Sequence, residues 1–276
     1  MSVAHLALLF CVQMAFGALT TFAIADRDAI GPKYFKFGGW ILIAFYGLAG
    51  SMVWGSGQDT GATSPHHPFL GTALAIAALS VLAFSSITGW DKPRFETLTL
   101  WVSLIAGAAA ISYSLPPASS GGTRQALAHA SALGSALVLG FTSWGMILGH
   151  WYLVDKNLDL RHLARIVKPL PWILLGKAVI AGLILLLFWE DVLGDSNQSM
   201  SDLLQRQPER ILDVVNIWAR IPIGLLIPAA LGWMALVTVR LKKTQPATGI
   251  LYAMCGVVYL GELMGKMVEG STGVPF

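Results

Sequence analysis

Two histidines, His5 and His129, are the first candidates for binding chemistry, because each opens an apolar segment in a similar local sequence. A neutral imidazole can ligate haem iron, and it can hydrogen-bond a quinone carbonyl while exchanging a proton. A haem held by two histidines needs imidazoles that face each other, which His5 and His129 provide if their helices pack face to face. Quinone contact, haem ligation, ligation of copper or another metal, and a structural or headgroup role all remain open for this pair.

Three further histidines are candidates for the same chemistry. His66 and His67 are adjacent in a loop rich in glycine, serine and threonine, so their side chains point in different directions. They are either solvated loop residues or partners that complete a site begun by His5 and His129. His150 is followed by two aromatic residues. It either binds a quinone ring or a lipid headgroup, or it ends a helix beside the carbonyl dipole, which favours imidazolium.

Charged side chains inside apolar segments are the remaining candidates, because a charge in hydrocarbon is costly and usually functional. Glu262 and Lys266 are four residues apart, so they share a helix face and can neutralise each other. At about 1.5 Å per residue, Glu262 lies about 20 Å from the inner end of its segment, toward the outer face. It is expected either to pair with Lys266 or to accept the proton released when a quinol is oxidised. Lys177 is expected to extend its ammonium to the inner surface.

These residues belong to a chain with too little polar surface to face water. Of its 276 residues, 55% are hydrophobic and only 12% are charged, whereas soluble domains carry about a quarter charged residues. Apolar runs of about twenty residues cross a bilayer, and in lipid they satisfy their own backbone hydrogen bonds as helices. The sequence predicts an all-α integral membrane protein with eight transmembrane helices near 3–25, 36–55, 69–89, 97–115, 126–149, 169–189, 219–240 and 248–268.

The loops between these helices divide the basic residues unevenly. Twelve of the eighteen Lys and Arg residues fall on one side, and the positive-inside rule makes that side cytoplasmic. Both termini then face outward, in a multi-pass protein of a bacterial-type cytoplasmic (inner) membrane. The longest outer loop, 190–218, has the amphipathic pattern of a helix that lies on the membrane surface. It either covers helix ends or docks a partner.

The chain is also expected to consist of two four-helix halves, 1–122 and 123–276. Short similar stretches open the first and second helices of both halves, with His5 and His129 in the first of them. An even number of helices per half predicts a parallel repeat, related by an axis along the membrane normal. Because the matches are short, chance similarity between apolar helices is the alternative.

Taken together, these residues favour a membrane subunit of a respiratory or photosynthetic electron-transfer complex that handles quinone or haem b near the outer face. Such a chain is a quinol-binding or a non-catalytic subunit of an oxidoreductase. Its expected partners are the lipid bilayer and other subunits, including an outer-side redox protein, and no nucleic acid. A small-solute transporter and a cofactor-free scaffold subunit are the alternatives.

In architecture the chain resembles the quinol-handling membrane anchors of the dimethyl-sulfoxide-reductase and polysulfide-reductase type. The resemblance covers the whole chain and consists of two four-helix bundles, both termini outside, and histidines near the outer surface. It includes no matched motif, so it transfers no residue's role.

Overall fold

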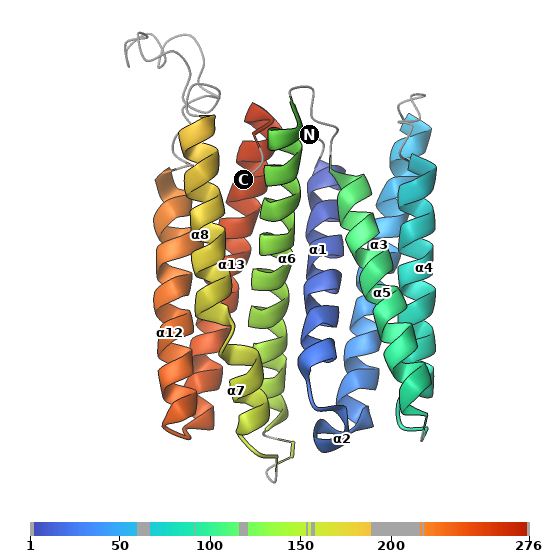
Figure 1. The fold of residues 1–276 in the computed structure, drawn as a ribbon, viewed down its shortest axis with the longest axis vertical. Helices are drawn as coiled ribbons and strands as arrows, with labels where there is room; N and C mark the ends of the chain where they lie inside the picture. The colour runs from blue at the N-terminus through green and yellow to red at the C-terminus, as the bar shows by residue number, and fades with distance from the viewer. Residues whose placement is uncertain are drawn as a thin grey trace.

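The computed structural model is a bundle of long helices that run roughly along one axis (Figure 1). It describes residues 3–59, 67–90, 92–115, 121–152, 154–155, 158–188, 216 and 218–274. Within these ranges, eight helices are long and apolar enough to cross a membrane. The all-α membrane fold predicted from composition is therefore confirmed, while most of the predicted amphipathic loop at 190–218 lies outside the described residues.

The helices follow the predicted order. The N-terminal half contains α1 (Val3–Ile24), the short α2 (Arg27–Ile30), α3 (Pro32–Asp59), α4 (His67–Ile87) and α5 (Pro93–Ser114). The C-terminal half contains α6 (Gly121–Trp151), α7 (Arg161–Val167), α8 (Leu170–Leu187), the π-helical η1 (Ile221–Leu226), α12 (Ile227–Arg240) and α13 (Thr244–Thr272). One span combines α7 with α8, and another combines η1 with α12.

The sixth span begins earlier than predicted, at Arg161 rather than near residue 169. The basic residues of α7 make this stretch look like a loop in the sequence, but its apolar residues and His162 are buried on one face. Pro169 separates α7 from α8, and Pro171 lies in the first turn of α8, because proline has no backbone N–H to donate and disturbs the preceding turn. The membrane segment is therefore longer than its apolar run.

Both halves arrange their helices in the same order. In the N-terminal half, α1 and α4 each contact both α3 and α5, and in the C-terminal half α6 and α12 each contact both α8 and α13. The two halves meet along α1 and α6, which lie side by side at the centre of the bundle (Figure 1). Equivalent helices thus have equivalent neighbours, while the repeat itself remains a prediction.

Two glycines allow α1 and α6 to approach closely. A side chain added at Gly17 would overlap the backbone at Ala136, and one added at Gly140 would overlap the backbone of Gly17. Small residues at such crossings increase van der Waals contact, which is a main source of helix association in lipid. The contact between the halves is therefore a backbone-to-backbone contact.

The N-terminal half has an aromatic interior. Phe22 of α1 packs against Tyr34, Phe35, Phe84 and Trp144, with ring centroids 5.2–6.2 Å apart. These rings come from α1, α3, α4 and α6, so one cluster joins the first half to the first helix of the second. Most of its pairs are edge-to-face, the geometry that the ring quadrupole favours.

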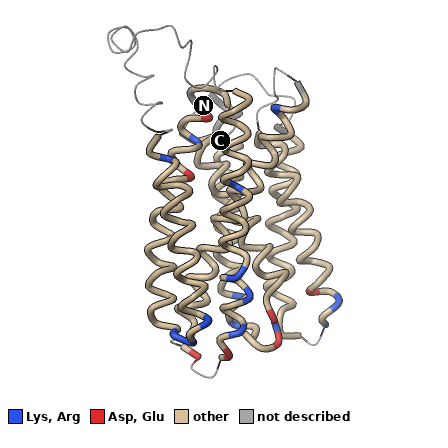
Figure 2. The backbone as a smooth tube through the Cα atoms, turned by 60° about the vertical axis from the view of Figure 1, so that its left-hand side comes forward, with Lys and Arg blue, Asp and Glu red and all other residues tan. Residues whose placement is uncertain are grey.

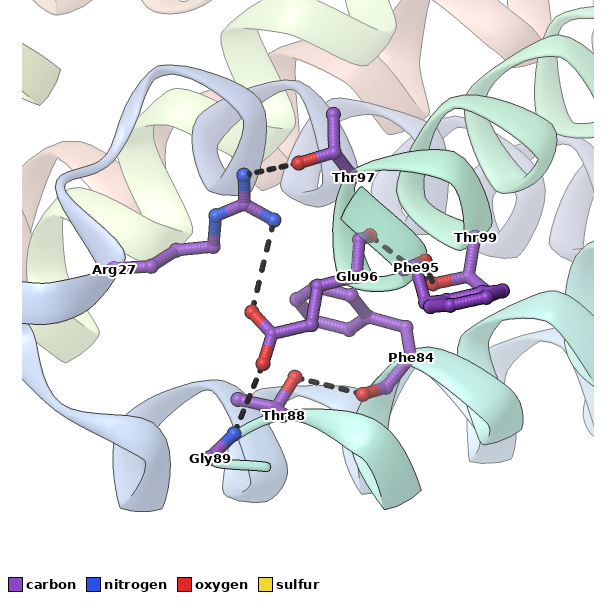
Figure 3. Close-up of polar contacts among 8 residues, drawn as sticks. All are labelled: Arg27, Phe84, Thr88, Gly89, Phe95, Glu96, Thr97 and Thr99. Atoms are coloured by element: carbon purple, nitrogen blue, oxygen red, sulfur yellow. Dashed lines mark hydrogen bonds and ion pairs between the residues drawn. The ribbon is translucent and has the colours of Figure 1, made fainter. Parts of the chain in front are cut away.

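The two ends of the bundle differ in charge. Both termini lie at one end, here called the termini end, and Lys and Arg residues gather at the other, the basic end (Figures 1 and 2). At the basic end, Arg27 of α2 lies 4.0 Å from the carboxylate of Glu96 on α5 and donates a hydrogen bond of 2.9 Å to Thr97 (Figure 3). Glu96 also accepts a bond of 3.0 Å from the backbone N–H of Gly89. These contacts tie two turns of the N-terminal half together.

Candidate functional site

Among the described residues, five Lys, Arg and Glu side chains are buried within the membrane spans of the C-terminal half. Together they form what we call the charge ladder: Lys177 on α8, Arg220 just before η1, and Glu262, Lys266 and Glu269 on α13. Each of them exposes 8% or less of its surface. A buried charge is tolerated in hydrocarbon only where opposite charges or hydrogen bonds compensate for the lost water. Each charge of the ladder therefore needs a compensating contact.

Lys177 and Glu262 form the deepest contact of the ladder. The Lys177 ammonium donates to the Glu262 carboxylate, and it also donates a bond of 2.7 Å to the hydroxyl of Ser135 on α6. Three helices, α6, α8 and α13, thus supply one polar centre. The pair has opposite charges and two hydrogen bonds, which is what allows it to remain ionised away from water.

The expectation that Lys177 extends to the inner surface is wrong. Because its span begins at Arg161, Lys177 lies ten residues before the end of the span at Leu187, about 15 Å from the termini end. Its aliphatic part packs near Gly134, and its ammonium points to Glu262 rather than to the basic end. The error follows directly from placing the start of this helix too late.

Glu262, Lys266 and Glu269 extend along one face of α13. Their spacings of four and three residues bring them onto the same side of a helix. The α13 span ends at Gly270, so Glu269 lies at the termini end. Glu262 lies about 12 Å from Gly270 along the helix. The sequence correctly places Glu262 and Lys266 on one face, and their charges interact. The hydrogen-bonded ion pair of Glu262, however, is with Lys177.

Arg220 enters the ladder through a gap left by glycines. A side chain at Gly265 would occupy the position of the Arg220 guanidinium, and Gly224 of η1 lies against Gly261 of α13. The charge of Arg220 interacts with both Glu262 and Glu269. The site therefore includes a cation that the sequence analysis did not single out. The sequence signals the close helix contact beside this cation through Gly261 and Gly265, which have small-x-x-x-small spacing.

A second polar contact lies about one helical turn closer to the basic end than Glu262. Tyr259 of α13 and Ser143 of α6 are joined by a hydrogen bond of 2.8 Å between their hydroxyl groups. Ser143 also approaches the sulfur of Met14 on α1 at 3.4 Å. Polar side chains thus continue between α6 and α13 below the charge ladder, and the sequence analysis did not single them out.

The predicted histidines are distributed over this framework. His5 lies close enough to Lys266 to interact with its charge, so it borders the ladder. His129 donates from Nδ1 to the carbonyl of Gln125 in its own helix, at 2.8 Å. The helices of the predicted site, α1, α6 and α13, do pack against one another, and haem ligation by His5 and His129 remains a prediction.

Of the other predicted ligands, His150 is the one whose side chain lies within the described residues. His66 is outside the described residues, and of His67 the structure describes the backbone, at the start of α4, but not the side chain. His150 lies at the basic end, where its Nδ1 is 3.3 Å from the hydroxyl of Tyr252. It is thus remote from the charge ladder. In the part of the chain that the structure describes, no three His, Cys, Asp or Glu side chains form a group that could hold a metal ion.

Comparison of the chain with protein family models, with curated proteins and with solved structures gives no match. The geometry of the charge ladder and the charges at the two ends of the bundle are the features that bear on function.

Proposed function

We propose that this chain is a membrane subunit of a respiratory or photosynthetic electron-transfer complex, in which Glu262 accepts a proton near the outer face when a quinol is oxidised. The observation that carries the proposal is the buried pair of Lys177 and Glu262, set in a ladder of charges that reaches the termini end. Ionisable groups inside a membrane are costly, and proton relays are one of their main uses.

In this proposal Glu262 acts as a proton acceptor. Oxidation of a quinol releases two protons and two electrons. The electrons pass to a redox protein on the outer side, one proton passes to the Glu262 carboxylate, and the other passes to water at the outer face. When Glu262 is protonated, its attraction to Lys177 weakens, while Lys177 keeps its bond to Ser135. Lys266 and Glu269 are the next ionisable groups toward the termini end, and they provide the exit for that proton.

The proposal requires the termini end to face outward. Eleven of the described Lys and Arg residues lie in or beside the elements of the basic end, which are α2, α7 and the adjoining ends of α3, α5, α12 and α13: Arg27, Lys33, Lys36, Lys92, Arg94, Arg161, Arg165, Lys168, Arg240, Lys242 and Lys243. Since short cytoplasmic loops are enriched in Lys and Arg, we assign the basic end to the cytoplasm of a bacterial-type inner membrane. Both termini, and Glu269 at the near end of the ladder, then lie on the side of the outer redox partner.

The test uses the complex purified from native membranes, assayed for quinol oxidation and for proton release on the outer side. We expect Glu262→Gln to lower quinol-dependent proton release about a hundredfold, the usual contribution of a positioned acid or base. Glu96→Gln is the matched control, because it neutralises a carboxylate at the basic end of the other half. Quinone extraction and an absorption spectrum with and without reductant identify the cofactor. An active complex that contains neither quinone nor haem contradicts the proposal.

A second candidate, a proton-coupled transporter of small solutes, is favoured by η1. This π-helical segment contains Pro222 and lies against the charge ladder through Gly224, and transporter sites are commonly built where helices are interrupted. Uptake into proteoliposomes driven by a pH gradient, in the absence of any redox partner, supports this class over the first. If Glu262→Gln leaves both uptake and electron transfer unchanged while the complex still assembles, the chain is a scaffold.

A further inference from the structure

A cavity of about 680 Å³ lies at the basic end, far from the charge ladder. It is enclosed by the last turn of α6, the start of α13, the turn between α12 and α13, and the chain at Leu158 and Leu160. Its volume is in the range of cavities that hold small ligands, about 300–1,000 Å³. Because α6 ends and α13 begins here, the cavity is at the level of the lipid headgroups.

The polar groups of this cavity suit an anion. Its described lining contains Lys242, His150, Gln245 and Tyr252, and no carboxylate. The Tyr252 hydroxyl lies 3.3 Å from His150 Nδ1; when that hydroxyl donates, the ring proton is on Nε2, which can donate to a ligand oxygen. An ammonium, an imidazole N–H and an amide N–H can thus converge on a phosphate.

One wall of the cavity is fixed. The Tyr152 hydroxyl donates to the carbonyl of Asp159 at 2.7 Å and accepts from the backbone N–H of Leu163 at 3.3 Å. Burial raises the pKa of Tyr152 to about 12, so this phenol stays neutral. Thr248 likewise donates to the carbonyl of Thr244, at 2.9 Å. These hydroxyl groups bind the backbone and fix the wall of the site, while the side chains of His150 and Lys242 can contact a ligand.

The backbone of Lys242 supports a role for its side chain. Within the described ranges it is the one residue other than glycine with a positive φ, 57°. It follows the last turn of α12, and its N–H donates to the carbonyl of Val239 at 3.0 Å. Glycine usually occupies this left-handed position after a helix, because a side chain strains the backbone there. A lysine at this position retains that strain and places a cation at the cavity.

Beyond the cavity, the lipid-facing side of α13 offers a surface on which an acyl chain can lie. Gly249, Tyr252, Gly256 and Leu260 are all exposed and are spaced three or four residues apart, so they form one stripe. The positions beside Gly249 and Gly256 are open space. A hydrocarbon chain that begins at the cavity can therefore lie against α13.

From these features we infer that the basic-end cavity binds one anionic phospholipid, with its phosphate held by Lys242 and His150 and an acyl chain along Gly249, Gly256 and Leu260. Basic pockets between transmembrane helices recognise acidic lipid headgroups in this way. The inference is independent of the proton chemistry proposed for Glu262.

The experiment is native mass spectrometry of the full chain, extracted in mild detergent from vesicles of phosphatidylglycerol and phosphatidylcholine. We expect the wild type to retain one phosphatidylglycerol in preference to phosphatidylcholine. Lys242→Gly should reduce that retention about fivefold, the effect of one cation near an anionic surface. It should not lower the melting temperature, since glycine relieves the backbone strain. His150→Ala tests the second contact, and Lys243→Gly is the matched control at the neighbouring cation.

Three results overturn the inference. Equal retention of both lipids removes the requirement for negative charge. Equal loss in Lys242→Gly and Lys243→Gly shows a diffuse effect of charge rather than a site. Displacement of the lipid by millimolar inorganic phosphate assigns the cavity to a soluble phosphate compound instead.

Discussion

The two halves of this protein pack their helices in the same order but place their ion pairs differently. In the N-terminal half, Arg27 and Glu96 pair at the basic end, with side-chain exposures of 23% and 13%. In the C-terminal half, Lys177 and Glu262 pair inside the membrane, with exposures of 2% and 4%. The described residues of the N-terminal half include no buried Lys, Arg, Asp or Glu, so helices can pack in this order without buried charge. A buried ion pair is weak support for stability, so its presence in one half indicates a functional role.

The largest effect is expected from a variant that removes one partner of the buried ion pair in the C-terminal half. Glu262→Ala leaves the Lys177 ammonium buried without its bonded carboxylate, and such a change costs about 3–5 kcal/mol. The double variant Lys177→Leu/Glu262→Leu removes both charges and should recover most of that loss. Unfolding in detergent measures the stability of the wild type and of both variants.

The double variant also makes the prediction falsifiable. If Lys177→Leu/Glu262→Leu is as unstable as Glu262→Ala, the pair stabilises the fold. The C-terminal half would then differ from the N-terminal half in architecture rather than in function.

The eight spans could be predicted from the sequence because bilayer thickness fixes the length of an apolar helix. The depth of Lys177 could not, since the span includes α7, whose basic residues resemble a loop. The partner of Glu262 was also out of reach: spacing reveals neighbours on one helix, such as Lys266, whereas Lys177 comes from another helix, 85 residues away. The same limit hid the contact between His150 and Tyr252. Arg220 was signalled only indirectly, by the glycines that leave it room.

A second prediction concerns the boundary between the halves. Gly140→Ala places a methyl group against the backbone of Gly17, and overpacking of this kind costs about 1–3 kcal/mol. Gly47→Ala is the matched control, because the space beside Gly47 is open. Unfolding in detergent should separate the two variants, and equal stabilities would mean that α1 and α6 can move apart freely.

A third prediction disturbs the charge ladder with little effect on the fold. Gly265→Ala displaces the Arg220 guanidinium, which costs about 0.5–1.5 kcal/mol in side-chain strain. The higher helix propensity of alanine offsets about 1 kcal/mol of that. We expect a melting temperature close to that of the wild type but altered proton release at the termini end. Unchanged proton release would show that Arg220 acts outside the ladder.

The smallest effect is expected where the N-terminal half has its own ion pair. Arg27→Ala removes the 4.0 Å contact with Glu96 and the hydrogen bond to Thr97 (Figure 3). Because this pair is partly exposed at the basic end, its loss should cost about 0.5 kcal/mol and should diminish at high salt. Glu96 keeps its bond from the Gly89 N–H, so it is not left without a partner as Lys177 is in Glu262→Ala. Unfolding of Arg27→Ala at low and high salt measures both effects. A loss as large as that of Glu262→Ala would show that the two ion pairs differ in position and not in energetic role.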